Sequence, residues 1–153
     1  MKMTPKLLKW LLNIYPPYLG AGVKISHISE DWKELNVSMS LRWYNRNFVG
    51  TQFGGSLYSM VDPHLMLLLM QLLGREYIVW DKAAEIDFIK PGKSKVHSVI
   101  SISDEVLAEI RQNTANGEKY FPNFIVEIKD EQDVLVASVK KTIYVRKKQS
   151  EPR

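Results

Sequence analysis

The amino-acid sequence predicts an α+β fold in which a curved, mostly antiparallel sheet of about six strands wraps around one long central helix. Several segments alternate apolar and polar residues with the period of two that is typical of half-buried strands. The stretch Gly54–Leu73 is apolar on nearly every face, and such a helix must be surrounded by other structure. Short connections favour antiparallel neighbours, so the prediction is a sheet that curls around this helix.

An amphipathic helix is expected at the start of the chain, over about residues 4–15. Lysines precede four leucines there, as in a secretory signal peptide, but Lys9 and Asn13 interrupt the apolar run. The Pro16-Pro17-Tyr18 sequence that follows offers no small-residue cleavage site. We therefore expect this helix to pack on the domain.

Alternation and turn residues set the bounds of the other elements. The segment from Leu35 to Trp43 is the clearest strand, because its apolar and polar side chains alternate strictly. Gly74 is a typical residue to end the central helix, and Asp104 is the expected N-cap of a short surface helix. The strands are expected over residues 23–28, 35–43, 77–89, 96–103, 120–128 and 134–145.

Composition limits the possible functions. The chain has 21 basic and 17 acidic residues, and its formal net charge of +4 is too small to predict nucleic-acid binding, although it favours a small polyanionic ligand. Cysteine is absent, which excludes disulfides, thiolate metal sites and a cysteine nucleophile and is compatible with a cytoplasmic protein. The longest apolar run, Leu65–Leu73, is too short to span a bilayer, so a soluble protein is expected.

No repeat, low-complexity segment or linker divides the chain. Residues 1–153 are therefore expected to form a single domain, with its core at about 20–147 and a charged tail at 146–153. Lys140-Lys141 and the charged residues of the tail are expected to be solvated, as short runs of like charge usually are.

Residues 47–62 are the most informative segment for function. A turn that contains Gly50, Gly54 and Gly55 leads directly into the apolar helix. A Gly-Gly pair at a helix start leaves the first backbone N–H groups unobstructed, and these donors suit a carbonyl oxygen or an oxyanion. One carboxylate, Asp62, interrupts the apolar stretch, and an acid is costly to bury there unless it is paired or used. Together these features predict a site for acyl transfer; the alternatives are close packing of the glycines and a structural ion pair of Asp62.

This segment resembles the hotdog-fold thioesterase superfamily, in which a curved sheet wraps one central helix, and most closely its phenylacetyl-CoA-thioesterase-like branch. The signature of that branch is Asn, then Gly, then His-Gly-Gly, then an acidic residue within the helix. Phe53 stands where the branch has its His. The residues that match the signature are Asn47, Gly50, Gly54, Gly55 and Asp62.

Three further motifs resemble an uncharacterised subfamily of the same superfamily, catalogued as a domain of unknown function (DUF4442). The resemblance in the pattern of elements covers about residues 20–147, while the sharp motif covers 47–64 only. The three motifs are Asp62-Pro63-His64, Trp80-Asp81-Lys82 and Phe88-Ile89-Lys90-Pro91-Gly92.

The resemblance implies a thioesterase that acts on an acyl-CoA. In this reading the Gly55 N–H, with Gly54 beside it, polarises the thioester carbonyl. Asp62 either activates water as a general base or attacks the carbonyl directly. Asn47 orients the reacting group. The resemblance also implies a homodimer or homotetramer, because members of the superfamily generally have their sites at a dimer interface.

Further substrate contacts are expected around the glycine pair. Gln52 could partly take the place of the missing His, and Phe53 implies a lower activity or a different substrate. Lysines near Pro91-Gly92 could hold the phosphates of coenzyme A or be solvated surface residues. No metal is implied, because no pair of histidines has metal-ligand spacing, and no cofactor is expected apart from the coenzyme A part of the substrate. The lysines are Lys82, Lys90, Lys93 and Lys95.

Other functions stay open at this point. Phe53 in place of His favours a non-catalytic protein that binds an acyl group or an acyl-CoA. A dehydratase on the same fold needs a His in the site, and His64 points away from Asp62 on a regular helix. An unrelated α+β cone fold usually has several helices before its sheet, which this order of elements lacks. The acyl group, and whether its carrier is coenzyme A or acyl-carrier protein, are not specified by the sequence.

Overall fold

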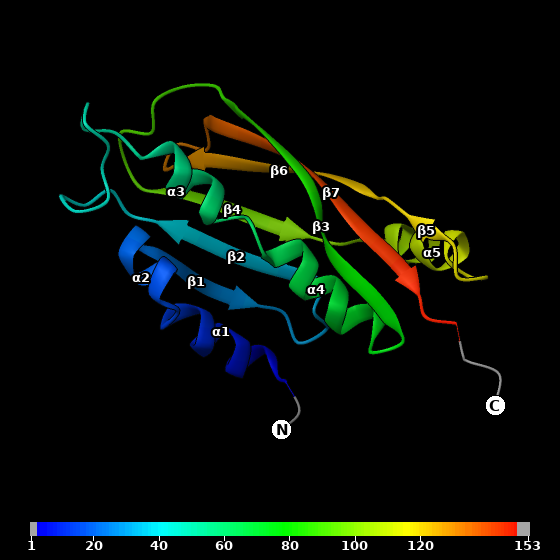
Figure 1. Cartoon of the computed structure of the whole chain (residues 1–153). Coiled ribbons are helices and arrows are strands. Elements are labelled where there is room, and N and C mark those ends of the chain that lie inside the picture. The colour runs from blue at the N-terminus through cyan, green and yellow to red at the C-terminus, as the bar shows by residue number, and fades with distance from the viewer. Residues whose placement is uncertain (1–2, 150–153) are drawn as a thin grey trace.

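Antiparallel strands form one curved sheet in the computed structural model, which describes residues 3–149 (Figure 1). The order along the sheet is β1-β2-β4-β6-β7-β3, and the short β5 pairs with β7 beyond the end of β6. The expected antiparallel sheet is confirmed, with one strand more than the six expected. The strands are β1 (Val23–Ile28), β2 (Glu34–Met39), β3 (Tyr77–Phe88), β4 (Val96–Ser101), β5 (Lys119–Tyr120), β6 (Asn123–Asp130) and β7 (Leu135–Lys147).

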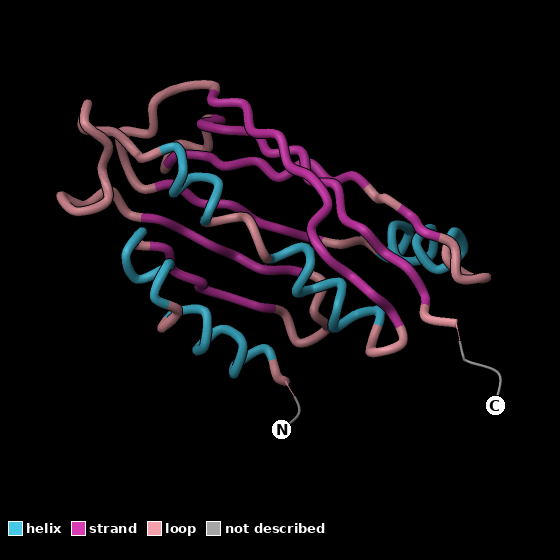
Figure 2. The backbone as a smooth tube through the Cα atoms, in the orientation of Figure 1, coloured by secondary structure: helices cyan, strands magenta, loops and turns pink. Residues whose placement is uncertain are grey.

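Two central helices cross the concave side of the sheet, and two further helices lie along β1 (Figure 2). The helix expected over about residues 4–15 is observed as α1, and a second short helix begins at Pro16. The last helix lies at the far end of the sheet, beside β5. The helices are α1 (Pro5–Asn13), α2 (Pro16–Ala21), α3 (Gly54–Ser59), α4 (His64–Leu73) and α5 (Asp104–Asn113).

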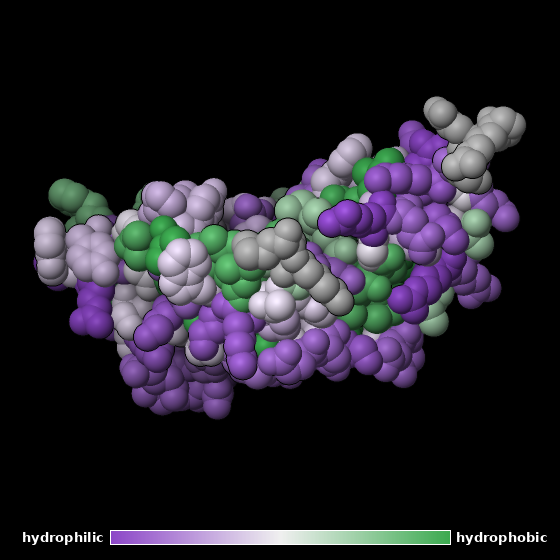
Figure 3. Space-filling model, turned by 90° about the horizontal axis from the view of Figure 1, so that it is seen from below, coloured by the Kyte–Doolittle hydropathy of each residue, from purple (hydrophilic) through white to green (hydrophobic). Residues whose placement is uncertain are grey.

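The core fills the space between the sheet and the central helices. Val37 and Met39 of β2 are buried on one side, and Leu65, Leu68 and Leu69 of α4 are buried on the other. Each fully buried side chain of this kind contributes about 1.5–3 kcal/mol relative to an exposed one. Figure 3 views the molecule from the side of α1 and α2, where hydrophilic residues cover most of the lower surface and apolar residues lie between them.

Pro63 interrupts the central helix and divides the stretch Gly54–Leu73 into α3 and α4. Proline has no N–H to donate to the carbonyl of Ser59, and its ring crowds that carbonyl. The chain tightens there instead, with the Asp62 N–H donating to the Ser59 carbonyl at 3.4 Å. The expected single helix is thus corrected: Asp62 lies in a turn between two helices and not inside one.

The stretch Gly54–Leu73 is also the one helical stretch, within residues 3–149, that is long and apolar enough by composition to cross a membrane. Its most apolar window has a mean hydropathy of 1.2, and 44% of that window is buried inside the domain. Core helices of soluble domains meet the same criteria, so length and composition do not distinguish the two cases.

The two edges of the sheet differ in how they are protected. At the β1 edge, the Asn13 side chain donates to the Ile25 carbonyl at 3.0 Å and accepts from the Ile25 N–H at 2.8 Å. At the other edge, β3 pairs with β7 on one side, and no strand in the described part of the chain pairs with its outer side. An unpaired strand of this length presents backbone donors and acceptors to another chain.

The second strand, expected to reach Trp43, ends at Met39. The Asn45 side chain explains the difference. It accepts from the Arg42 N–H at 2.7 Å and donates to the Ser40 carbonyl at 2.7 Å, so residues 40–45 curl into a loop. The apolar alternation continues past the point where the backbone leaves the sheet, which is why the prediction was too long.

Two smaller differences concern the ends of α5 and β7. The Ser103 hydroxyl accepts from the Val106 N–H at 3.3 Å, so Ser103 is the N-cap of α5, and Asp104, the expected cap, is its first residue. Strand β7 continues to Lys147 and includes the start of the expected charged tail. The end of that tail, residues 150–153, lies outside the described residues.

Candidate functional site

The candidate site is centred on a buried lysine of β7 that was expected to be a solvated surface residue. Residues Val139, Lys141 and Ile143 lie on the same face of β7, and their side chains are completely buried. Lys141 therefore occupies a core position, and the expectation that it is solvated was wrong. Its neighbour Lys140 points to the other face and is exposed.

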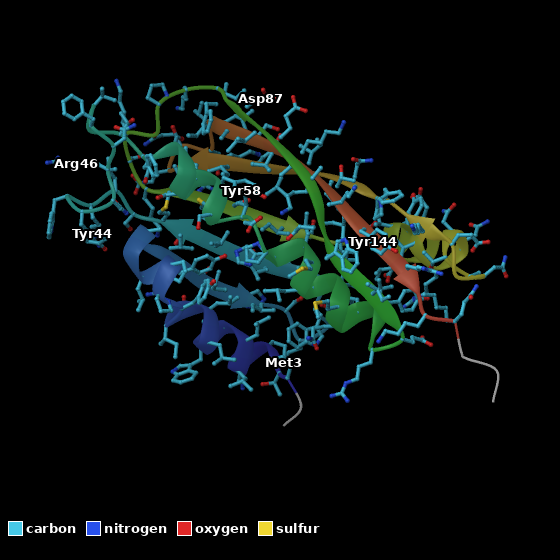
Figure 4. All side chains as sticks on the ribbon, in the orientation of Figure 1. Met3, Tyr44, Arg46, Tyr58, Asp87 and Tyr144 are labelled. Atoms are coloured by element: carbon cyan, nitrogen blue, oxygen red, sulfur yellow. The ribbon has the colours of Figure 1, made fainter. Side chains whose placement is uncertain are left out.

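The Lys141 ammonium group contacts three residues from three elements. Its Nζ lies 3.0 Å from Asp62 Oδ1 and 2.8 Å from the Asp62 carbonyl oxygen. It lies 2.7 Å from Asp81 Oδ1 on β3, outside hydrogen-bonding alignment, so this contact is ionic. The Tyr58 hydroxyl completes the group at 3.3 Å from Nζ and donates to Asp62 Oδ1 at 2.5 Å. Figure 4 shows Tyr58 on α3. We call Tyr58, Asp62, Asp81 and Lys141 the lysine cluster.

The charges in the lysine cluster follow from this geometry. Burial alone would lower the pKa of the Lys141 ammonium, but Asp81 and Asp62 outweigh burial and raise that pKa above its usual value. Burial and the hydrogen bond to Asp62 raise the pKa of the Tyr58 hydroxyl, so this group stays protonated and donates. A cationic lysine between two carboxylates satisfies the requirement that a buried charge be paired.

Asp62 is both held and accessible. Its Oδ1 receives hydrogen bonds from Tyr58 and Lys141, and its side chain is 43% exposed, whereas Lys141 is fully buried. Within residues 3–149 no hydrogen bond engages Oδ2. The carboxylate is thus fixed through one oxygen, and the other oxygen is available to a water molecule or a substrate.

A buried histidine lies next to the turn that carries Asp62. The His64 Nε2 lies 2.9 Å from the carbonyl oxygen of Met60 and 3.2 Å from the hydroxyl of Tyr18. Burial lowers the pKa of His64 to about 4, so the ring is neutral at pH 7. This residue packs inside the protomer and links α2 to the start of α4.

Gly54 and Gly55 form the first turn of α3, and two phenylalanine rings pack against them. A Cβ at Gly54 would lie 3.0 Å from Phe88 Cζ, and a Cβ at Gly55 would lie 2.8 Å from Phe53 Cε1. The Phe53 backbone precedes the helix without a side-chain cap. Close packing therefore explains why both positions lack a side chain, while their N–H groups have no hydrogen-bond partner within the described chain.

Asn47 and Gln52 hold the loop that precedes α3. The Asn47 side chain donates to Thr51 Oγ1 at 2.9 Å and accepts from the Thr51 N–H at 2.9 Å. The buried Gln52 side chain donates to the carbonyls of Met39 at 3.2 Å and Ser94 at 3.0 Å. No hydrogen bond or ion pair joins either residue to Asp62, so the structure does not bring these expected site residues together with it.

The lysines expected to hold coenzyme A near Pro91-Gly92 differ in their surroundings. Lys90 forms an ion pair with Asp130, and this pairing lowers the pKa of the Asp130 carboxyl. Lys93 and Lys95 are exposed on the loop that follows. Within the described chain, no group of three or more His, Asp and Glu residues is arranged to hold a metal ion. One hollow of about 660 Å³ lies near the end of α4, between Met70, Arg75 and neighbouring residues, and Asp62 does not line it.

Three residues of the lysine cluster, Tyr58, Asp81 and Lys141, are absent from the site expected from the sequence. Lys141 could have been identified because it alternates with the apolar residues Val139 and Ile143, so it lies on the strand face that is otherwise apolar. Asp81 had a weaker signal, because it lies two residues after the buried Val79 in the same strand. Their partners are remote in sequence, so only the fold reveals the pairing.

Comparisons with known proteins agree with this fold. A family model described as "Domain of unknown function (DUF4442)" matches residues 4–145, and no curated protein matches the chain. The chain is similar to a solved Pseudomonas aeruginosa protein of unknown function described as a probable thioesterase, with a TM-score of 0.82 and 15% identity over 96% of this chain and 98% of that chain.

Two other solved structures are similar over most of their length. A thioesterase from Haemophilus influenzae has a TM-score of 0.69 and 15% identity over 100% of this chain and 97% of that chain. A mutant of a phenylacetic acid degradation protein from Thermus thermophilus has a TM-score of 0.58 and 20% identity over 84% of this chain and 97% of that chain. At these identities the likeness is one of fold, a curved sheet around a central helix.

Proposed function

Because the chain belongs to the DUF4442 family and has the hotdog fold of thioesterase-like proteins, we propose that it hydrolyses the thioester bond of an acyl-CoA. The observation that carries this proposal is the carboxylate of Asp62, which is fixed through Oδ1 and open at Oδ2. A preoriented, accessible carboxylate can serve as the general base that activates water for acyl transfer.

In the proposed reaction, Asp62 Oδ2 accepts a proton from a water molecule as the water oxygen attacks the thioester carbonyl carbon. The carbonyl oxygen becomes an oxyanion, and the Gly55 N–H at the start of α3, with Gly54 beside it, stabilises that charge. The C–S bond then breaks, and the leaving thiolate takes the proton from Asp62. The products are a carboxylic acid and free coenzyme A, and no further cofactor takes part. Direct attack by Asp62 on the carbonyl carbon is the other route that the same geometry allows.

Lys141 has a supporting part in this proposal. Its ammonium pairs with Asp62 Oδ1, and the Tyr58 hydroxyl donates to the same oxygen, so the carboxylate is held in one orientation. Substrate contacts from Phe53 and the exposed Lys93 remain part of the proposal, while Lys90 is engaged with Asp130 and the buried Gln52 with the carbonyls of Met39 and Ser94.

The proposed functional unit is a homodimer. No strand among residues 3–149 pairs with the outer side of β3, and Asp81, which belongs to β3, connects this edge directly to Lys141 and so to Asp62. A second copy that paired with β3 would therefore approach the candidate site. Light scattering of the purified chain measures this directly: a dimer or tetramer supports it, and a monomer at micromolar concentration contradicts it.

The first test of the proposed function is thiol release from a panel of short, long and aromatic acyl-CoAs. Asp62→Asn should abolish turnover, while Glu131→Gln, a matched change at an exposed turn, should leave it unchanged. Equal activity of Asp62→Asn and the unmutated protein on every accepted substrate would overturn the role of Asp62.

A second candidate function is binding of an acyl-CoA without hydrolysis. The specific observation that favours it is the Phe53 ring, which packs over Gly55 where the family branch has a histidine. Calorimetric titration with acyl-CoAs distinguishes the two functions. Stoichiometric binding with no release of free thiol would favour the binding protein.

A further inference from the structure

The loop between β2 and α3 ends in a tight turn whose two central residues are apolar. The Gly50 N–H donates to the Asn47 carbonyl at 3.0 Å, and the Asn47 N–H donates to the Thr51 carbonyl at 2.7 Å. Gly50 has a φ of 84°, which closes the turn in the left-handed region. Phe48 and Val49 therefore occupy the two central positions, which usually hold Gly, Pro, Asn, Asp or Ser.

The exposure of this turn is extreme for apolar side chains. Phe48 is fully exposed, Val49 is 77% exposed, and Trp43 in the same loop is 82% exposed. Trp43 packs edge-on against Tyr44, with ring centroids 5.6 Å apart. Figure 3 shows an apolar projection at the end of the molecule that carries this loop. Two backbone hydrogen bonds hold this turn in a conformation that exposes a phenylalanine and a valine to water. Exposed apolar residues at positions that usually hold polar or small residues indicate a binding surface.

The two loops that meet at this end of the molecule carry basic but no acidic residues, and Asp130 at the adjoining end of β6 pairs with one of their lysines, Lys90. Residues 40–61 contain Arg42 and Arg46 and no acidic residue, and residues 89–103 contain three lysines and no acidic residue. Gln52 ties the two loops together, because its N–H donates to the Gly92 carbonyl at 2.8 Å and its side chain to the Ser94 carbonyl. Figure 4 shows Tyr44 and Arg46 at this end, away from Tyr58.

We propose that this end of the molecule docks on a membrane surface that contains anionic lipids. Phe48 and Val49 would enter the boundary between head groups and acyl chains, Trp43 and Tyr44 would lie at the head-group level, and Arg42 and Arg46 would contact lipid phosphates. Aromatic side chains favour that interface, and each basic residue near an anionic surface adds to the attraction. A symmetric contact between two copies is disfavoured, because it would bring the arginines of both copies together.

The test is co-sedimentation of the purified chain with vesicles, and it does not depend on the proposed hydrolysis. Binding is expected to phosphatidylcholine vesicles that contain phosphatidylglycerol, and it should weaken in pure phosphatidylcholine and at high salt. The double variant Phe48→Ser/Val49→Ser should weaken binding at least about tenfold. The variant Arg42→Glu/Arg46→Glu should weaken it by at least about tenfold as well.

Matched controls lie elsewhere on the surface. Ile125→Ser removes an exposed apolar side chain from β6, and Lys119→Glu reverses an exposed charge on β5, so neither should change vesicle binding. Thermal unfolding of the loop variants should match that of the unmutated protein, since the changed side chains are exposed.

Three results would overturn the proposal. The first is no binding to either kind of vesicle, and the second is equal binding by the loop variants. The third is a smaller oligomeric mass of Phe48→Ser/Val49→Ser in light scattering, which would assign the turn to a contact between copies. If the purified chain binds the vesicles but releases no thiol from any acyl-CoA, the proposed hydrolysis is contradicted and the membrane proposal is not.

Discussion

The Lys141 Nζ lies 2.8 Å from the carbonyl oxygen of Asp62 and 3.0 Å from its Oδ1, so one strand side chain binds both the backbone and the carboxylate of the turn between α3 and α4. Pro63 creates that turn and leaves carbonyl groups without helical partners. The lysine therefore donates to a backbone carbonyl at the break in the central helix, and it also fixes the orientation of the Asp62 carboxylate.

Replacement of Lys141 by methionine is the direct test of this relationship. Lys141→Met leaves two partly exposed carboxylates without a cation and the Asp62 carbonyl without its donor, which should lower the free energy of unfolding by about 1–3 kcal/mol. Urea denaturation measures the change. Lys140→Met, at the exposed neighbouring position, should stay within about 0.5 kcal/mol of the unmutated protein. Equal stability of the two variants would contradict the pairing.

The start of α3 should tolerate no side chain at Gly54 unless Phe88 is also changed. A Cβ at this position would lie 3.0 Å from the Phe88 ring, and overpacking of this kind lowers the free energy of unfolding by about 1–3 kcal/mol. In a double-mutant cycle, Phe88→Leu should remove most of the cost of Gly54→Ala. Additive effects of the two changes would argue against this contact.

The sequence predicted the sheet well because alternation with a period of two reports directly which strand residues are buried. The predicted β2 was four residues too long at its C-terminal end. The hydrogen bond from the Asn45 side chain to the Ser40 carbonyl ends the strand, and periodicity does not detect such a local contact. Proline at position 63 was visible, yet the run of apolar residues around it favoured one helix over two.

The candidate site was only partly predictable. Asp62 and the glycines were identifiable because they lie close together in one segment with a motif. Lys141 and Asp81 reach Asp62 from strands that are distant in the sequence, so their pairing depends on the register of β3 and β7. Asn47 and Gln52 were expected to face a substrate, but in the described chain their side chains bond to their own and neighbouring loops.

Stability should fall at mildly acidic pH because of His64. Its pKa is about 4 in the folded protein and near 6.5 when the chain is unfolded, so the unfolded state binds more protons between these values. The free energy of unfolding therefore rises with pH across this window, and about 3 kcal/mol is lost as the pH falls from about 6.5 to 4. His64→Gln should flatten this dependence in urea titrations from pH 4 to 7, and His27→Gln, an exposed control, should preserve it.

The last prediction concerns Phe53, which replaces the histidine of the related thioesterases. Its ring is exposed and packs over Gly55, so a histidine at this position would lie beside the N–H group proposed to stabilise the oxyanion. A well-positioned imidazole donor or base contributes roughly 10²-fold or more to acyl transfer, and Phe53→His should raise kcat/KM for the best acyl-CoA by at least about tenfold. Phe53→Leu removes the ring without adding a donor and separates this effect from improved access. If both variants gain equally, access limits the rate; if neither gains, Gly55 does not stabilise the oxyanion, and binding without hydrolysis becomes the better account.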